Sequence, residues 1–161
     1  MITETQEQLP RTVLMVCTGN YYRSRYAELL FNALAPAGLG WRADSRGFAP
    51  SPWNSGPIAA VVLDRLAAAG FAPPAAPRPP LRLTPADIES ADMLIALDEK
   101  EHRPYVEGLG QPWASRFRLW VVPDLHEWPV ERALSAIEDE VRTLLTLLAF
   151  RCESPEASAL G

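Results

Sequence analysis

The stretch from Val13 to Ala27, VLMVCTGNYYRSRYA, constrains the fold of this chain more than any other part. It begins with a run of consecutive apolar residues, which is typical of a parallel strand covered on both faces. A short polar loop follows from Cys17, and Gly19 and Asn20 within it permit unusual backbone angles. From Ser24 onwards the apolar residues recur at helical spacing. The stretch therefore predicts a buried strand, a tight loop and the first turns of a helix.

The ends of this loop carry a cysteine and an arginine, Cys17 and Arg23, in the spacing Cys-x5-Arg. If the loop curls, its backbone N–H groups point at one spot and, with the helix N-terminus, form a cradle for a dianion. Arg23 can donate two parallel hydrogen bonds to phosphate oxygens, and the same positive surroundings stabilise a thiolate at Cys17. Ser24 can donate a further hydrogen bond to the sulfur. The pattern thus indicates a nucleophile on the floor of a phosphate cradle, suited to attack on phosphorus through a thiophosphate intermediate.

The loop resembles the phosphate loop of the low-molecular-weight protein tyrosine phosphatases, whose pattern is V-C-x-G-N-x-C-R-S-P. The agreeing positions are Cys17, Gly19, Asn20, Arg23 and Ser24. Tyr22 replaces the family's second cysteine, and Arg25 replaces its proline. The resemblance implies a phosphate-binding loop made of Thr18, Gly19, Asn20, Tyr21, Tyr22 and Ser24.

The bulk properties of the chain exclude several other classes of protein. Its 161 residues favour one domain with a sizeable core, taken as residues 1–161 with mobile tails at 1–11 and 153–161. A net charge of −5 gives no case for nucleic-acid binding, and no apolar run is long enough to span a bilayer. The two cysteines make neither a disulfide framework nor a zinc motif, and a working thiolate fits a reducing, cytoplasmic setting. We expect no metal or cofactor, and a monomer or weak dimer.

Three further strands are predicted, at residues 41–47, 92–98 and 117–122. Helices are predicted between them, one stopping near Gly70 and one opened by a capping box from Thr84 to Asp87. A closing helix is predicted to carry its own capping box from Ser135 to Glu138. This alternation predicts a three-layer α/β sandwich with a four-stranded parallel sheet. The resemblance, which covers about residues 12–150, implies the phosphotyrosine protein phosphatase I-like fold with strand order 2-1-3-4.

The resemblance also implies site residues outside the loop. Trp53, in a W-N-x-G segment, is similar to the tryptophan that walls the entrance to the family's active site, and Trp128 is expected to form a second aromatic wall. Ser45, at the C-terminal end of the second strand, is expected to support the loop through Asn20. Arg78 stands where the family has a histidine that helps to order the phosphate loop.

Asp124, which follows the fourth strand, takes the position of the family's general acid. Protonation of a leaving phenolate needs a carboxylic acid on a loop opposite the nucleophile. Leu125 replaces the proline that usually follows this aspartate, and we expect a more mobile loop for that reason. His126 is a nearby rival for the role of the acid.

The sequence therefore predicts an enzyme, a protein-tyrosine phosphatase of the low-molecular-weight type. Its substrate is a phosphotyrosine-containing protein or an aryl phosphate, because a long aryl phosphate reaches the floor of the cradle and phosphoserine is too short. Cys17 is expected to attack, Arg23 to hold the phosphoryl oxygens, and Asp124 to protonate the leaving group and then activate water.

Three other functions stay open at this point. An arsenate reductase shares the cradle but needs resolving cysteines near the nucleophile, and none lies between Thr18 and Arg151. In protein arginine phosphatases a threonine takes the position of Tyr21. A catalytically weak module that binds phosphate or phosphopeptides is favoured by the replacements at Tyr22, Arg25, Arg78 and Leu125.

Overall fold

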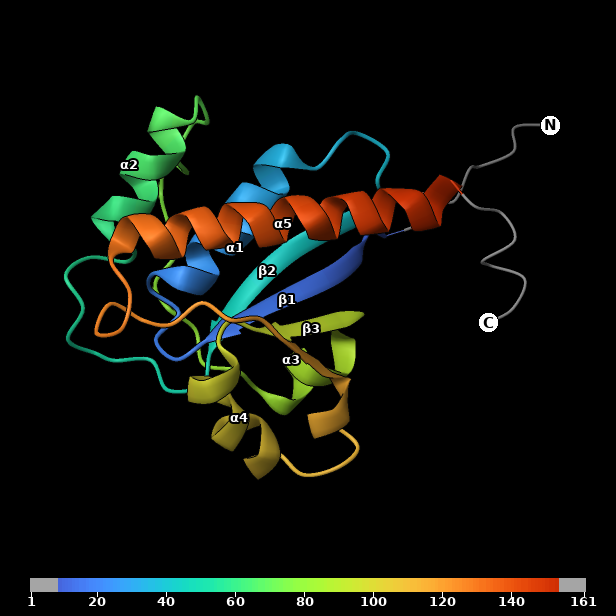
Figure 1. Ribbon diagram of the computed structural model, residues 1–161. Helices are drawn as coiled ribbons and strands as arrows, with labels where there is room; N and C mark the ends of the chain where they lie inside the picture. Colours follow the sequence, from blue (N-terminus) through green and yellow to red (C-terminus); the bar gives the residue numbers. More distant parts are fainter. Residues whose placement is uncertain (1–8, 154–161) are drawn as a thin grey trace.

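The computed structural model describes residues 9–153 and shows a parallel sheet between two layers of helices (Figure 1). The strands are β1 (Arg11–Cys17), β2 (Trp41–Gly47), β3 (Met93–Ala96) and β4 (Phe117–Leu119). They lie in the order β2-β1-β3-β4, and every neighbouring pair is parallel. The structure thus confirms the predicted α/β class, the four-stranded parallel sheet and the order 2-1-3-4.

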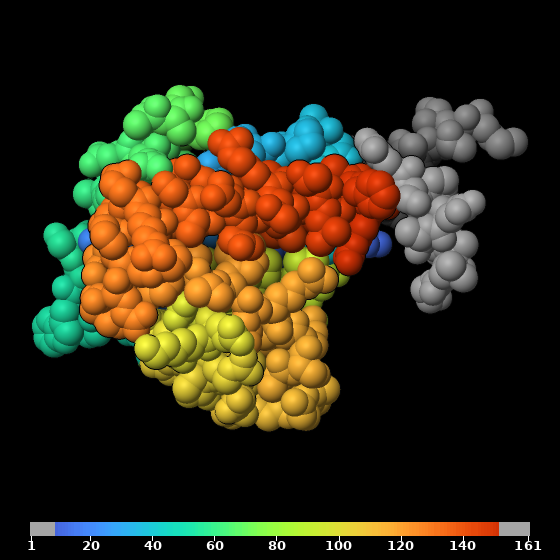
Figure 2. All heavy atoms as spheres, viewed as in Figure 1, coloured from blue at the N-terminus to red at the C-terminus, as the bar shows by residue number. Residues whose placement is uncertain are grey.

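Five α-helices and one short 3-10 helix connect the strands. They are α1 (Arg23–Leu34), α2 (Ala60–Ala68), α3 (Pro85–Ser90), α4 (Glu99–Gly108), the 3-10 helix η1 (Ala114–Arg116) and α5 (Val130–Glu153). Helices α1, α2 and α5 cover one face of the sheet, and α3 and α4 cover the other (Figure 1). Helix α5 crosses the outside of the first layer, with α2 beside its N-terminal end (Figure 2). There Arg65 pairs with Glu131 and Glu138.

The central strand β1 divides the core into two parts. Val13 and Met15 point into the cluster beneath α1 and α5, whereas Leu14 and Val16 point into the cluster beneath α3 and α4. All four side chains are buried, as the continuous apolar run predicts for a strand with helices on both faces. Full burial of each such side chain contributes about 1.5–3 kcal/mol. The strand is therefore a rigid base for the loop that follows it.

The predicted strand at 41–47 is confirmed, whereas the strands predicted at 92–98 and 117–122 are shorter, at Met93–Ala96 and Phe117–Leu119. The capping box of Thr84 and Asp87 is present at the start of α3. The predicted capping box from Ser135 to Glu138 is wrong, because α5 begins at Val130. The Glu138 carboxylate instead accepts hydrogen bonds from Tyr26 and Arg65 within the fold. A pattern that resembles a helix start thus serves tertiary contacts inside a helix.

The ends of the chain differ from the prediction in part. Arg11, expected in a tail, opens β1, and its N–H donates to the carbonyl of Gly40 at 2.9 Å. Helix α5 runs to Glu153, and the rest of the expected tails, at 1–8 and 154–161, lies outside the described residues. Within residues 9–153, no helix combines the length and apolar character that crossing a membrane requires.

Candidate active site

The loop from Cys17 to Ser24 lies at the C-terminal edge of the sheet, between the end of β1 and the start of α1. In parallel α/β sheets this edge is where ligands bind. The N-cap residue of α1, Tyr22, makes no side-chain capping hydrogen bond, so its side chain does not occupy the backbone N–H groups of the first turn. The loop is also tied to β2, because Phe48 N–H donates to the Cys17 carbonyl at 2.9 Å. Gly47 is needed at this approach, since a Cβ there would lie 2.7 Å from the Thr18 carbonyl oxygen.

The thiol of Cys17 is almost fully buried and has two polar neighbours. Its Sγ lies 3.0 Å from Ser24 Oγ and accepts from the Asn20 backbone N–H at 3.3 Å. Ser24 Oγ already accepts a hydrogen bond from Asn20 Nδ2 at 2.9 Å, which leaves the serine O–H free to donate to the sulfur. Two donors therefore converge on Cys17, as a thiolate requires.

Asn20 fixes the shape of the loop. Its φ of 51° is the left-handed conformation that asparagine tolerates, and it is the one positive φ at a non-glycine position within residues 9–153. Gly19, also expected to use unusual angles, has no positive φ, so the turn depends on Asn20 alone. The Asn20 amide is satisfied at both ends: Nδ2 donates to Ser24 and Ser45, and Oδ1 accepts from Arg78 and the Leu81 N–H.

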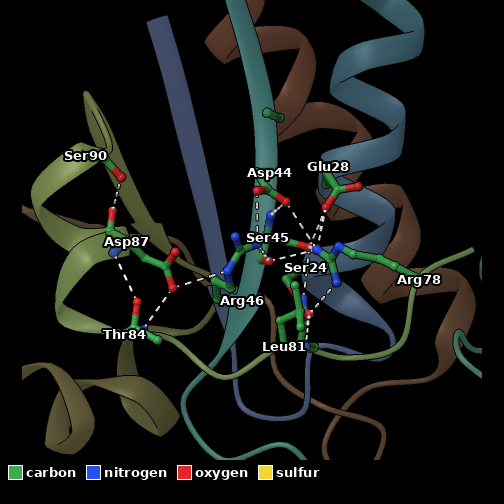
Figure 3. A network of polar contacts seen from close by, with 12 residues as sticks. Ser24, Glu28, Asp44, Ser45, Arg46, Arg78, Leu81, Thr84, Asp87 and Ser90 are labelled. Atoms are coloured by element: carbon green, nitrogen blue, oxygen red, sulfur yellow. Dashed lines mark hydrogen bonds and ion pairs between the residues drawn. The ribbon is translucent and has the colours of Figure 1, made fainter.

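Arg78 supports this asparagine, and Figure 3 shows its guanidinium group directed at Ser45 and Glu28. Its Nη1 donates to Asn20 Oδ1 at 3.0 Å, and its Nη2 donates to the Ser45 carbonyl at 2.8 Å. Nη2 also lies 3.1 Å from Glu28 Oε1, which accepts from Ser45 Oγ at 2.6 Å. The network expected to depend on Ser45 is therefore complete, with a guanidinium where the family has an imidazole.

Replacing Arg78 by alanine is expected to lower kcat on p-nitrophenyl phosphate by about tenfold, because a loosened Asn20 misplaces the loop amides. The matched control is Arg42→Ala, which removes an exposed arginine of the neighbouring strand β2. Steady-state kinetics of the two variants provide the measurement. Equal, small effects on kcat would show that Arg78 does not order the loop.

Arg23 is buried at the rim of the loop and held from two sides. Its Nη1 donates to the Val122 carbonyl at 2.9 Å, and its Nη2 donates to Glu101 Oε2 at 2.6 Å. Burial alone would lower the pKa of Arg23, but Cys17, Glu101 and Asp124 together raise it above its usual value. A guanidinium has five N–H groups, so three stay available for phosphoryl oxygens. The two protein contacts thus fix the direction in which the arginine presents those donors.

Glu101 is the site residue that the sequence did not reveal. Its Oε2 accepts hydrogen bonds from Thr18 Oγ1 at 2.5 Å and from Arg23 at 2.6 Å, and lies 2.8 Å from His102 Nε2. His102 Nδ1 accepts from the Asp98 N–H at 2.9 Å, so the neutral ring carries its proton on Nε2 and donates to Glu101. Burial alone would raise the pKa of Glu101, but these three donors hold it far below its usual range. Glu101 is therefore a permanent anion beside Arg23.

A capping interaction at the start of α4 positions Glu101 towards the loop. Asp98 is the N-cap of α4 and accepts from the Glu101 N–H at 3.0 Å. This capping bond places Glu101 in the first turn, facing the loop. The sequence signal that could have revealed Glu101 is its position three residues after Asp98, the spacing of a capping box.

Asp124 lies beside Arg23, on the loop between β4 and α5. Its Oδ2 is 3.6 Å from Arg23 Nη2, and its Oδ1 accepts from the Leu125 N–H at 2.8 Å. The Asp124 carbonyl also accepts from the N–H groups of Glu127 and Trp128, which closes a tight turn. The rival acid His126 is 68% exposed, and its ring nitrogen lies 3.7 Å from Glu127 on the outside of that turn. The geometry therefore favours Asp124 over His126 as the candidate general acid.

The two expected aromatic walls differ in character. Trp53 is 90% exposed, so it does not pack beneath its loop. That loop is tied to the phosphate loop, because Tyr21 Oη donates to the Ser55 carbonyl at 2.6 Å. Trp128 is half-buried against the core, and the Arg132 guanidinium lies 3.9 Å from the centroid of its ring system. Trp53 is free to meet a ligand, whereas Trp128 is held in place.

The two departures within the loop motif are buried in the interior. Tyr22 packs in the core beneath α1 and α5, and its hydroxyl has no hydrogen-bond partner among the described residues. Burial and the nearby Asp124 charge raise the pKa of Tyr22 to about 12. Arg25 is 1% exposed and donates from Nη1 to the Pro57 carbonyl at 3.1 Å. Both side chains are thus directed into the fold and leave the loop motif intact.

The fold and this loop define a class of protein. Residues 12–151 match the family described as low molecular weight phosphotyrosine protein phosphatase, and the chain belongs to that family. This confirms the resemblance seen in the sequence. A search of curated proteins returned no match.

Solved structures similar to this chain share its fold. The low molecular weight protein tyrosine phosphatase SP-PTP of Streptococcus pyogenes is 22% identical, with a TM-score of 0.69, and the match covers 93% of this chain and 98% of that one. YfkJ of Bacillus subtilis is 24% identical, with a TM-score of 0.74, covering 88% and 96%. The YwlE arginine phosphatase of Geobacillus stearothermophilus is 22% identical, with a TM-score of 0.68, covering 89% and 94%. At these identities the likeness shows the fold alone.

Proposed function

We propose that this protein is a protein-tyrosine phosphatase that uses Cys17 as its nucleophile. Membership of the family makes it a phosphatase. The observation that carries the finer proposal is the pair of donors on the buried Cys17 sulfur, next to an arginine held with three free N–H groups. Cys17 is 3% exposed, on the floor of the loop, where an aryl phosphate reaches more easily than the short phosphoserine.

The proposed reaction has two displacements at phosphorus. The Cys17 thiolate attacks and forms the S–P bond, the P–O bond to the phenolate breaks, and Asp124 gives its proton to that leaving oxygen. Asp124, now ionised, takes a proton from water, whose oxygen attacks phosphorus and releases the thiolate. Arg23 and the loop amides stabilise the charge on the equatorial oxygens in both steps.

The role of Asp124 is tested by changing the leaving group. Asp124→Asn is expected to lose about 10²–10³-fold in kcat/KM on phenyl phosphate, and much less on p-nitrophenyl phosphate, whose leaving group needs no proton. His126→Asn is the control, because it alters the neighbouring rival acid. Equal losses of Asp124→Asn on both esters would assign the acid elsewhere.

One observation favours a second candidate, a protein arginine phosphatase. Two carboxylates, Glu101 and Asp124, face the loop at Arg23, and such a negative rim suits a cationic leaving group. A comparison of kcat/KM on a phosphotyrosine peptide and on a phosphoarginine peptide of the same sequence separates the two candidates. The resolving cysteine of an arsenate reductase has no counterpart among the described side chains, where Cys17 is the single cysteine.

A further inference from the structure

A basic pocket lies at the opposite edge of the sheet from the phosphate loop. Its volume is about 510 Å³. It is lined by Arg11, Trp41, Asp92, Met93, Arg116, Arg118 and Arg151. Arg11 and Cys17 begin and end β1, so the two sites are separated by the length of the strand, about 20 Å.

Four separate elements bring the four arginines together. Arg11 opens β1, Arg116 ends η1, Arg118 lies in β4 and Arg151 lies in the last turn of α5. The end of α5 lies at the same edge of the sheet as the start of β1 (Figure 1). Apart from Arg116 and Arg118, which are two residues apart, these arginines are distant in sequence, so the cluster is a product of the fold and not a charged run.

Within residues 9–153, the positive charge of this pocket is largely uncompensated. The ion pairs among the described residues involve other cations, and none includes one of these four arginines. The one carboxylate in the lining, Asp92, accepts from the Thr12 N–H at 2.8 Å through Oδ2. The chain as a whole carries a net charge of −5, so this cluster of arginines is a positively charged site on a negatively charged protein.

Part of the pocket is held rigidly. Arg116 donates from Nη1 to the Ile88 carbonyl at 2.5 Å and from Nη2 to the Ala91 carbonyl at 2.6 Å. The Arg11 guanidinium lies 5.8 Å from the centroid of the Trp41 ring. Arg118 and Arg151 are exposed and free to turn towards a ligand. Planar guanidinium groups from several directions match the oxygens of adjacent phosphates.

We propose that this pocket binds a small molecule with two or three linked phosphate groups, separately from the catalytic loop. Its size is that of a small-molecule site, which favours such a ligand over a macromolecular surface. Trp41 offers a ring on which a nucleobase can stack. The ligand is therefore either a nucleoside polyphosphate or an inorganic phosphate chain, and both share the chemistry that the arginines recognise.

The test is calorimetric titration of the full chain with sodium tripolyphosphate at low salt. Because the phosphate loop also binds anions, the titration is repeated with Arg23→Ala, in which binding at the pocket is expected to persist. Arg118→Glu is expected to weaken that binding by at least about tenfold. Arg142→Glu, the same charge change on an exposed arginine of α5 outside the lining, is expected to change it by less than about twofold. Neither glutamate variant is expected to alter kcat/KM on p-nitrophenyl phosphate.

Three results would overturn the proposal: no binding by the wild type, loss of binding in Arg23→Ala, or equal weakening in Arg118→Glu and Arg142→Glu. Arg151→Glu serves as a second variant of the pocket if Arg118→Glu does not fold. Titration with ATP distinguishes the two sources of the ligand. If ATP binds more tightly than tripolyphosphate and Trp41→Ala abolishes that difference, the ligand is a nucleotide. If the two bind equally, the pocket recognises the phosphate chain alone.

Discussion

Replacement of Cys17 by serine is expected to lower kcat on p-nitrophenyl phosphate by more than about 10³-fold. The reason is that a serine hydroxyl stays protonated in surroundings that stabilise a thiolate. The two donors on the sulfur, from Ser24 and the Asn20 N–H, have no comparable effect on the neutral hydroxyl. Phosphate binding is expected to survive, because the amides and Arg23 are unchanged.

Steady-state kinetics and phosphate binding of Cys17→Ser provide the measurement. Cys152→Ser, the same change at the other cysteine of the chain, is the control and is expected to keep wild-type activity. Alkylation by iodoacetate gives an independent check, since phosphate in the loop should protect Cys17 from it. Near-normal turnover by Cys17→Ser would exclude the covalent mechanism proposed for this site.

Substitution of Arg23 by lysine is expected to reduce kcat/KM by about 10²–10³-fold, although the charge is kept. Arg23 holds Val122 and Glu101 while it presents three further N–H groups. A lysine ammonium has three donors at a single point, so it cannot keep these two contacts and also bind two phosphoryl oxygens. The loss should fall mainly on kcat, because the fork is matched to the equatorial oxygens of the transition state.

The matched control is Arg65→Lys, which makes the same change at an arginine paired with Glu131 and Glu138 beside α5. Thermal unfolding of both variants separates a defect in folding from one in catalysis. Activity of Arg23→Lys close to that of the wild type would remove the bidentate contact from the mechanism.

The strand, the phosphate loop and the left-handed Asn20 could all be predicted from the sequence, because each depends on neighbours within a few residues. The apolar run of β1 predicts a strand that is buried on both faces, and the Cys-x5-Arg spacing predicts a short loop whose backbone curls around one point. The capping box of Thr84 and Asp87 is local in the same way. The strand order came from resemblance to a family, since pairing between strands is not a local property.

The partners of the site residues were decided by the tertiary structure. Glu101 meets Arg23 across 78 positions of sequence, and Arg78 meets Asn20 across 58. The Ser135 to Glu138 pattern shows the converse: it has the sequence of a capping box but lies inside α5, where Glu138 accepts hydrogen bonds from Tyr26 and Arg65. Local sequence restricts backbone dihedral angles, which is why the loop and the positive φ of Asn20 could be predicted from the residues around them. The residues that hold Arg23 and Asn20 come from other elements and from the loops between them, and only packing of the whole sheet sets their distances.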